Sequence, residues 1–407
     1  MNRDLLKTPV RVREAKGVRN GRAIKSATPA SVRDVNRSII LSLIRVHEPI
    51  SRVELSDRTG IFRSSVSAIV DELVGESLVI EQRATPKGRG RVPVNLFLNP
   101  KGFRVLGISI RPFQTSVAAS GLTGGFEETV SFATPREPAG LLKELGKAVR
   151  GIGWPGNGFH EIGISVPGMV NAETGEILTV PSLREYADFP IAREVSSLLG
   201  APASAENDCN LAALAEMWLN ESEVAGVHDF VLVQIGDVGV GAGLIIGNEL
   251  YGGHDHTWVG EFGHMIVQPD GKQCSCGRRG CWELYVSDRA TWNRYDADKP
   301  YSPDRIEDLI RLAAGGDATA RRALGATAEY LSLGITNIVM GLNPQRIVLA
   351  GEITKAWGLI GQTVESAYAP DRIRFQVYPA RFGPEALALR GSVILALRRV
   401  FAPPKLG

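Results

Sequence analysis

A complete set of metal-binding side chains is concentrated in residues 260–283 of the 407-residue chain. This stretch holds three of the four cysteines, Cys274, Cys276 and Cys281, and His264 lies ten residues before the first of them. One neutral imidazole and three thiolates fill the tetrahedral coordination of zinc, which is typical of a structural rather than a catalytic ion. Three glycines between the ligands let the backbone turn tightly enough to direct the sulfurs to one point. The pattern predicts a structural Zn²⁺ at His264, Cys274, Cys276 and Cys281.

Simpler interpretations of this cluster stay open at this point. The cysteines could form one disulfide and leave a free thiol, but the basic first 30 residues lack the apolar core of a secretory signal. We therefore expect a reducing, cytoplasmic environment, where disulfides are rare. Spacing alone defines the histidine ligand least, so His254 or His256 could take the place of His264.

Two glutamates flank the cluster. Glu261 lies three residues before His264, and Glu283 lies two residues after Cys281. A metal loop that holds its own backbone rigid also holds these neighbours in place. Two carboxylates and an imidazole that converge on one cleft suit the hydroxyl groups of a sugar. The alternative is a pair of solvated glutamates without a ligand.

The spacing of these residues resembles the signature of a known family. Glu261-x-Gly263-His264 is followed by Cys274-x-Cys276-Gly277-x-x-Gly280-Cys281-x-Glu283. This long pattern is similar to that of the ROK family (repressors, open reading frames and kinases), and the resemblance covers essentially the whole chain. It implies a two-lobed actin-like (ribonuclease H-like) domain over residues 103–407, which binds a sugar in the cleft between its lobes and dimerises.

The charge of the chain is divided unevenly between its two parts. Residues 1–104 carry 20 Lys and Arg against 10 Asp and Glu, whereas the remaining residues carry 26 against 34. A basic first part joined to an acidic body predicts that only the first part meets a polyanion such as DNA. Residues 1–30 have no hydrophobic periodicity and are expected to form a flexible basic tail. No apolar run reaches the ~18 residues of a membrane span, so no membrane partner is expected.

Residues 31–98 carry the signals of a winged helix-turn-helix. Ser31 has the character of an N-cap, apolar residues follow at helical spacing, and Pro49 closes the segment. The sequence Ser51-Arg-Val-Glu54 is a capping box that begins a second helix. Gly60 ends that helix, as a left-handed turn residue would.

The third helix of this segment is the candidate for base recognition. Its predicted buried face consists of apolar residues, namely Val66, Ile69, Val70 and Leu73. Short polar side chains and one arginine on the other face can reach base edges in a major groove; these are Arg63, Ser64, Ser65 and Ser67. Two strand-like runs follow, and the basic, glycine-rich segment between them predicts a wing whose Arg89 and Arg91 enter the minor groove. The alternative is a three-helix packing module with a solvated loop.

From Val105 onward, strand-like runs alternate with helical ones, which indicates a layered α/β body. A ROK kinase resembling this body would hold ATP phosphates on a glycine-rich loop after its first strand. Here the segment Ser109–Thr115 lacks the acidic residue and both glycines, and Pro112 has no N–H to donate. The second loop of the family has Asp237 next to the expected phosphates, and the late Gly-Gly element reads Ala350-Gly351-Glu352. Three departures on the nucleotide side predict that the chain is not a kinase.

The sugar side retains the residues that the resemblance requires. In a kinase of this family, the residue that matches Asp208 would be the general base toward the sugar hydroxyl. An ionised Asp208 can also hold a hydroxyl without phosphoryl transfer, or can simply cap a helix. The residues expected to bind the effector are Asn207, Asp208, Glu261, His264 and Glu283.

Together these features predict a sugar-responsive transcription factor that binds double-stranded operator DNA. We expect a repressor, released by a sugar or sugar derivative, that forms a homodimer or a tetramer. Two alternatives remain, an active ROK sugar kinase with an appended DNA-binding domain and a DNA-bound scaffold that has lost its ligand.

Overall fold

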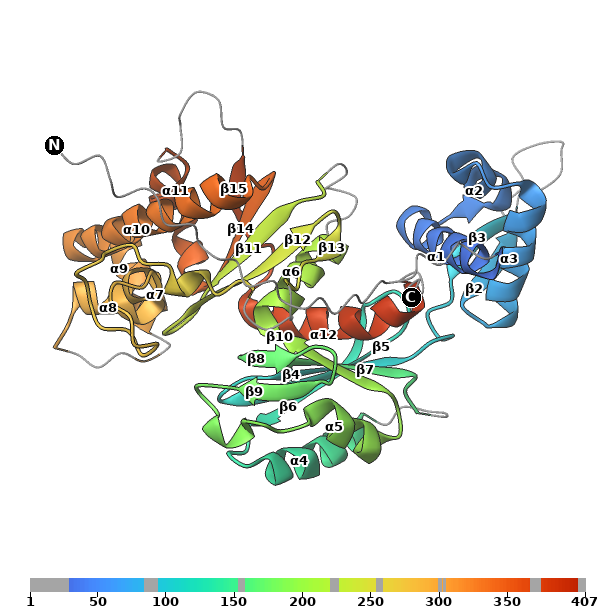
Figure 1. The fold of residues 1–407 in the computed structure, drawn as a ribbon, viewed down its shortest axis with the longest axis horizontal. Helices are drawn as coiled ribbons and strands as arrows, with labels where there is room; N and C mark the ends of the chain where they lie inside the picture. The colour runs from blue at the N-terminus through green and yellow to red at the C-terminus, as the bar shows by residue number, and fades with distance from the viewer. Residues whose placement is uncertain are drawn as a thin grey trace, which may run out of the picture.

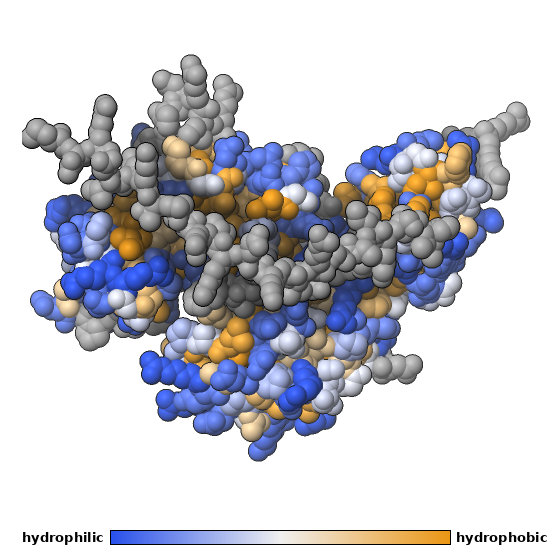
Figure 2. Space-filling model, in the orientation of Figure 1, coloured by the Kyte–Doolittle hydropathy of each residue, from blue (hydrophilic) through white to orange (hydrophobic). Residues whose placement is uncertain are grey.

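The computed structural model describes residues 29–83, 94–152, 158–219, 227–253, 259–298, 302, 305–366 and 375–401. They form a small N-terminal module beside a body that contains two five-stranded sheets (Figure 1). In the space-filling view the module protrudes from the body, and apolar residues interrupt its hydrophilic surface (Figure 2). Most of the predicted tail, both wing arginines Arg89 and Arg91, and the alternative ligands His254 and His256 lie outside the described residues.

The N-terminal module consists of three helices and a small antiparallel sheet of order β1-β3-β2. Its helices are α1 (Pro29–His47), α2 (Arg52–Thr59) and α3 (Arg63–Gly75). Its strands are β1 (Ile50–Ser51), β2 (Val79–Arg83) and β3 (Val94–Leu98). Three helices followed by a hairpin match the arrangement that the sequence predicts.

Most local signals of this module are confirmed. Ser51 and Glu54 form the reciprocal capping box, and Gly60 ends α2 with φ of 71°. The four apolar residues predicted for α3 are its buried ones. The predicted start of the first helix is wrong, because α1 begins at Pro29 and Ser31 lies inside it. Proline is favoured in a first helical turn, since its φ is already helical and its missing N–H needs no partner there.

The first lobe of the body is a mixed sheet of order β10-β7-β4-β5-β6. Its strands are β4 (Val105–Ile110), β5 (Gln114–Ser120), β6 (Phe126–Ala133), β7 (Glu161–Val166) and β10 (Ala203–Asn207). Helices α4 (Pro138–Gly151) and α5 (Ile191–Leu199) cover one face, and the short elements β8 (Met169–Asn171), β9 (Glu176–Thr179) and η1 (Arg184–Tyr186) complete this lobe.

The second lobe is a sheet of order β13-β12-β11-β14-β15. Its strands are β11 (Phe230–Ile235), β12 (Val240–Ile246), β13 (Glu249–Leu250), β14 (Arg346–Ala350) and β15 (Gln376–Pro379). The remaining elements of this lobe pack on the outer face of the sheet or lead into the helices there. They are η2 (Phe262–His264), α7 (Glu283–Val286), α8 (Asp288–Tyr295), α9 (Arg305–Ala314), α10 (Ala318–Leu342), η3 (Glu352–Ala356) and α11 (Trp357–Ser366). Within the described ranges, no helix is long and apolar enough to cross a membrane.

Helices α6 (Asp208–Leu219) and α12 (Pro384–Phe401) lie between the two sheets and pack directly on each other (Figure 1). Gly391 allows this approach, because a Cβ there would lie 2.1 Å from the carbonyl oxygen of Leu211. Gly243 does the same on the other side of α6, where a Cβ would lie 2.4 Å from the carbonyl oxygen of Cys209. Helix α6 is therefore held between α12 and β12 at backbone distance.

The last turns of α12 also belong to the core of the N-terminal module. Val393, Leu397 and Phe401 are buried in one cluster with Ile40 and Leu41 of α1. One helix thus contributes to the packing of the first lobe, of the second lobe through α6, and of the N-terminal module. Its position links all three parts of the molecule.

Candidate functional site

The start of α6 places the predicted Asn207–Asp208 pair at the floor of the cleft between the lobes. The Asn207 side chain accepts hydrogen bonds from the backbone N–H groups of Cys209 and Asn210, at 2.9 and 3.1 Å. Its amide nitrogen donates to the carbonyl of Gly168, at 2.9 Å. Asn207 is therefore the helix cap and also ties the loop before β8 to the helix.

Asp208 is the first residue of α6, and Asn207 before it caps the helix. Asp208 therefore does not have to serve as the cap, a role that the sequence did not exclude. One carboxylate oxygen accepts the N–H of Cys209 at 3.0 Å, and Gln234 donates to the other at 3.3 Å. Burial raises the pKa of Asp208, and the positive charge of Arg111 acts against that rise. Both oxygens of the carboxylate thus accept hydrogen bonds within the protein.

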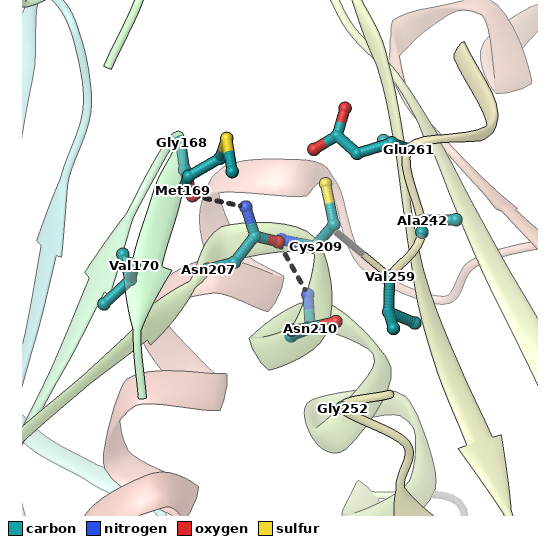
Figure 3. Close-up of a pocket in the computed structure, with 12 residues that line it drawn as sticks. Gly168, Met169, Val170, Asn207, Cys209, Asn210, Ala242, Gly252, Val259 and Glu261 are labelled. Carbon is teal, nitrogen blue, oxygen red and sulfur yellow. Dashed lines mark hydrogen bonds between the residues drawn. The ribbon is translucent and has the colours of Figure 1, made fainter. Parts of the chain in front are cut away.

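A pocket opens above this helix start, between elements of both lobes (Figure 3). Asn207 and Glu261 are the predicted effector residues that line it, and Glu261 reaches it from the opposite wall. Burial raises the pKa of Glu261, with nearby Glu283 and Asp208 adding to the rise and His264 opposing it. Gly260 brings this wall close, since a Cβ there would lie 1.9 Å from the carbonyl oxygen of Ala242.

Several pocket residues have no marked signal in the sequence. They are the apolar and small groups Met169, Val170, Cys209, Asn210, Gly252 and Val259, with Gly168, Gly241 and Ala242 beside them. The position of Gly168 after β7 is the sequence feature that could have indicated these residues, because loops at the carboxyl ends of parallel strands line ligand clefts in α/β folds.

The four predicted metal ligands converge on one point. Their donor atoms all lie within 4.8 Å of one another. The Sγ atoms of Cys276 and Cys281 are 3.6 Å apart, and Cys274 Sγ lies 3.7 Å from His264 Nδ1. Metal–sulfur bonds of about 2.3 Å in a tetrahedron require edges of about 3.8 Å, so the spacing fits a metal ion.

The three thiols of the cluster differ in their pKa values. Burial raises the pKa of the Cys274 thiol to about 12 and raises that of Cys281, whereas a hydrogen bond from the backbone of Arg278 lowers the pKa of Cys276 to about 6. A metal ion bound by all three sulfurs would have to displace the protons of the two buried thiols.

His264 and Glu283 connect the cluster to the pocket. His264 turns Nδ1 toward the sulfurs, and its Nε2 lies 3.9 Å from the Glu261 carboxylate. Glu283 lies 3.5 Å from His264 Nδ1 and 3.0 Å from Cys274 Sγ. The structure thus brings Glu261, His264 and Glu283 together, with Glu283 behind the pocket lining rather than in it.

Trp282 anchors this loop to the second lobe, which the sequence analysis did not recognise. Its ring is fully buried, and its indole N–H donates to the carbonyl of Tyr330 at 2.7 Å. Gly334 of α10 makes room for the ring, because a Cβ there would lie 2.0 Å from it. The loop that carries the cluster is therefore attached to the core between its last cysteine and Glu283.

The segment where a kinase would hold phosphate is a closed hairpin turn. The N–H of Arg111 donates to Gln114, and the carbonyl of Arg111 accepts from Thr134 Oγ1 at 2.6 Å. Pro112 has no N–H, and Arg111 Nε lies 3.6 Å from the Glu385 carboxylate. The backbone groups of Arg111 are thus engaged within the protein.

Three acidic residues of the second lobe, Asp237, Asp288 and Glu352, lie near one another. Gly236 closes a tight turn with Gly239, and the start of α8 docks on this turn through the backbone of Asp288. Burial raises the pKa of Asp288 well above its usual range, and repulsion from Asp237 and Glu352 adds to it. Of these carboxylates, that of Glu352 pairs with the ammonium group of Lys355.

The predicted base-reading residues begin α3. Arg63, Ser64 and Ser65 are exposed, and Ser67 is half-buried with its carbonyl accepting a hydrogen bond from Arg52. These residues share one exposed helix start, opposite the apolar face that packs on α1 and α2.

The ROK family pattern matches residues 105–398 of the sequence. The chain belongs to the ROK family. It is 30% identical over 375 residues to the xylose repressor of Bacillus subtilis, covering 89% of this chain and 95% of the repressor.

Two solved ROK structures are similar to this one. A ROK family transcriptional regulator, described as a homologue of the Escherichia coli MLC protein, has a TM-score of 0.75 and 25% identity and covers 91% of this chain and 100% of its own. A ROK glucokinase from Streptomyces griseus, solved with glucose and AMPPNP, has a TM-score of 0.62 and 25% identity and covers 72% of this chain and 99% of its own.

Asp208→Asn tests the electrostatics of the cleft floor. A carboxyl whose pKa is raised by folding opposes folding once the pH passes above its ordinary value of about 3.9. We expect the variant to be more stable than the wild type at pH 7–8, with the difference vanishing as the pH falls to about 4. Urea unfolding across this pH range measures it.

Asp57→Asn, an exposed carboxylate of the N-terminal module, is the control and should change stability little at any pH. A wild type as stable as Asp208→Asn at pH 8 would contradict the interpretation and would show that the carboxylate is fully stabilised by its partners.

Proposed function

We propose that this ROK protein is a sugar-responsive DNA-binding transcriptional regulator, a repressor released when a sugar or sugar derivative binds the cleft. The observation that carries the proposal is an asymmetry within one cleft. On the sugar side Asn207 and Glu261 line a pocket, whereas on the phosphate side the N–H of Arg111 is used within its own turn and Asp237 and Glu352 lie near the buried Asp288. Such a cleft suits binding of a polyhydroxylated ligand without phosphoryl transfer.

The effector residues in this proposal are Asn207, Asp208, Glu261, His264 and Glu283. A carboxylate accepts strong hydrogen bonds from hydroxyl groups. Asp208 is the first residue of α6, and Glu261 reaches the pocket from the wall of the second lobe (Figure 3). The small and apolar pocket residues around them suit the C–H faces of a sugar ring. Recognition from both lobes also means that ligand binding favours one lobe arrangement over others.

The metal in this proposal is a structural zinc bound by His264, Cys274, Cys276 and Cys281. The donor set is filled by the protein, so the ion would have no open position for chemistry. It would hold the His264 ring and the two flanking glutamates in place relative to the pocket.

We expect one zinc per chain in protein purified without added metal. Elemental analysis measures it, together with release during chelation followed by a metal-sensitive dye. Cys281→Ser should lose the ion and lower the melting temperature, because the loop would lose its internal link. Cys209→Ser, which changes the cysteine outside the cluster, should keep the ion. Protein that contains no zinc and has four titratable thiols would contradict this assignment.

DNA binding is assigned to residues 31–98, and effector binding and dimerisation to residues 103–407. The repressor relative and the regulator structure cover 89% and 91% of this chain, whereas the glucokinase covers 72%. The larger share of this chain that the repressor and the regulator match supports a regulator with a DNA-reading module. The excess of Lys and Arg over Asp and Glu in residues 1–104 suits phosphate contacts. The regulator would act in the cytoplasm as a homodimer or tetramer on a two-fold operator.

The proposal is tested with full-length protein and a duplex selected from a random DNA library. We expect salt-sensitive binding of this duplex, and a sugar from a thermal-shift panel should weaken it 10- to 100-fold. Asp208→Asn and Glu261→Gln should lose the sugar response and keep the affinity for DNA. If neither variant changes the response, the sensor lies elsewhere. Sugar-dependent ADP release that Asp208→Asn abolishes would instead establish the kinase alternative.

Helix α6 offers a direct path from the effector to the DNA-binding module. It begins at Asp208 and runs about 18 Å to its last turn, where Trp218 lies. The guanidinium of Arg45, from α1, lies 3.7 Å from the centre of the Trp218 ring. Phe401 of α12 contacts the same ring edge-on at 5.2 Å. A shift of α6 on effector binding would therefore reach α1 through one stacked contact.

Trp218→Ala should separate sugar binding from DNA release. We expect nearly unchanged sugar affinity and at least threefold less weakening of DNA binding by sugar, since a desolvated cation–π contact is worth about 2 kcal/mol. Trp218→Phe keeps an aromatic face and should give an intermediate effect. A full sugar response in Trp218→Ala would show that coupling runs by another route, such as lobe rotation within the dimer.

A further inference from the structure

We propose that Phe62 is a specificity-determining residue of the DNA-binding surface and that it reads the methyl group of a thymine in the major groove. This inference rests on the proposed DNA-binding function. Phe62 immediately precedes α3, the helix whose first residues are Arg63, Ser64 and Ser65. Three features of the residue lead to the assignment, namely its helix position, its exposure and its neighbours.

The helix position of Phe62 does not suit its side chain. Phe62 is the N-cap of α3 and makes no side-chain capping hydrogen bond, because a benzyl group cannot accept one. Ser, Thr, Asp and Asn are the residues favoured there. The preceding helix of the same module has such a cap, with Ser51 accepting from the N–H of Glu54. Helix formation therefore does not account for a phenylalanine at this position.

Core packing does not account for it either. Phe62 is 83% exposed, although the apolar residues of α3 that face the core, Val66, Ile69, Val70 and Leu73, are buried. A large apolar ring in water gains nothing from folding and would bury its surface only against a partner. The described residues of the protein do not cover the Phe62 ring.

The neighbours of Phe62 identify the class of partner. Arg63, Ser64 and Ser65 are exposed on the same helix start and are basic or short and polar, as base-reading side chains are. The N-terminal residues of a recognition helix contact base edges in the major groove. The thymine methyl is the apolar group that base pairs present there, and phenylalanine is among the side chains that contact it. We infer that Phe62 selects a T·A pair through this methyl.

The experiment uses full-length protein and the duplex selected from a random library, with each thymine of a half-site replaced in turn by deoxyuridine. Deoxyuridine pairs like thymine and lacks only the methyl group. At one or two positions we expect the replacement to weaken wild-type binding about fourfold, the value of one buried methyl group. Phe62→Ala should bind the thymine duplex more weakly and should no longer distinguish the two duplexes at those positions.

Phe62→Ser separates DNA reading from folding, because it should raise the stability of the protein while it removes thymine discrimination. Serine supplies the missing cap, so the variant should melt at a higher temperature than the wild type and still lose thymine discrimination. The matched control is Phe113→Ala, which removes a ring of the body that is 76% exposed and should leave DNA binding unchanged.

Each result has one meaning for the inference. Thymine discrimination that disappears in both Phe62 variants supports it. Discrimination that persists in Phe62→Ala, or a selected duplex without any deoxyuridine-sensitive position, overturns it while leaving the DNA-binding function intact. A wild-type protein that selects no duplex at all contradicts the proposed function itself.

Discussion

The structure depends on the close packing of α6 against α12 between the two sheets. Gly391 and Gly243 let backbone meet backbone on both sides of α6, and any larger side chain at either position would separate the layers. Interiors packed at this density transmit small displacements instead of absorbing them. Because the pocket between the lobes lies at the start of α6 and the N-terminal module packs on the end of α12, the same contact supports both the fold and the proposed signal.

In the proposed function, the cleft binds a ligand without transferring a phosphoryl group. Phosphoryl transfer needs backbone donors and cations around the moving phosphate. In this chain the N–H of Arg111 is used by its own turn, and Asp237 and Glu352 lie near the buried Asp288. Hydroxyl recognition needs only acceptors held in place, which Asp208 and Glu261 still provide. The two halves of the cleft meet different demands, so one can change without the other.

The metal cluster explains how the second lobe contributes a rigid wall. The loop that carries Glu261, His264 and Glu283 contains little regular secondary structure, so its shape depends on side-chain links. Convergent cysteines form one link, and the buried Trp282 forms a second with α10. A side chain on such a loop, including the proposed effector residue Glu261, is positioned almost as firmly as one on a helix, which lowers the entropic cost of ordering it on ligand binding.

The sequence by itself determined the features that act over a few residues. The capping box at Ser51, the left-handed Gly60 and the buried face of α3 follow from local hydrogen bonds and helical period, and the clustering of the three cysteines follows from their spacing. Only the tertiary structure decided that Asn207 rather than Asp208 caps α6, that Met169 and Val259 line the pocket, and that Arg45 stacks on Trp218. These contacts join residues distant in the chain, and their partners are set by how whole layers pack, which local periodicity does not encode.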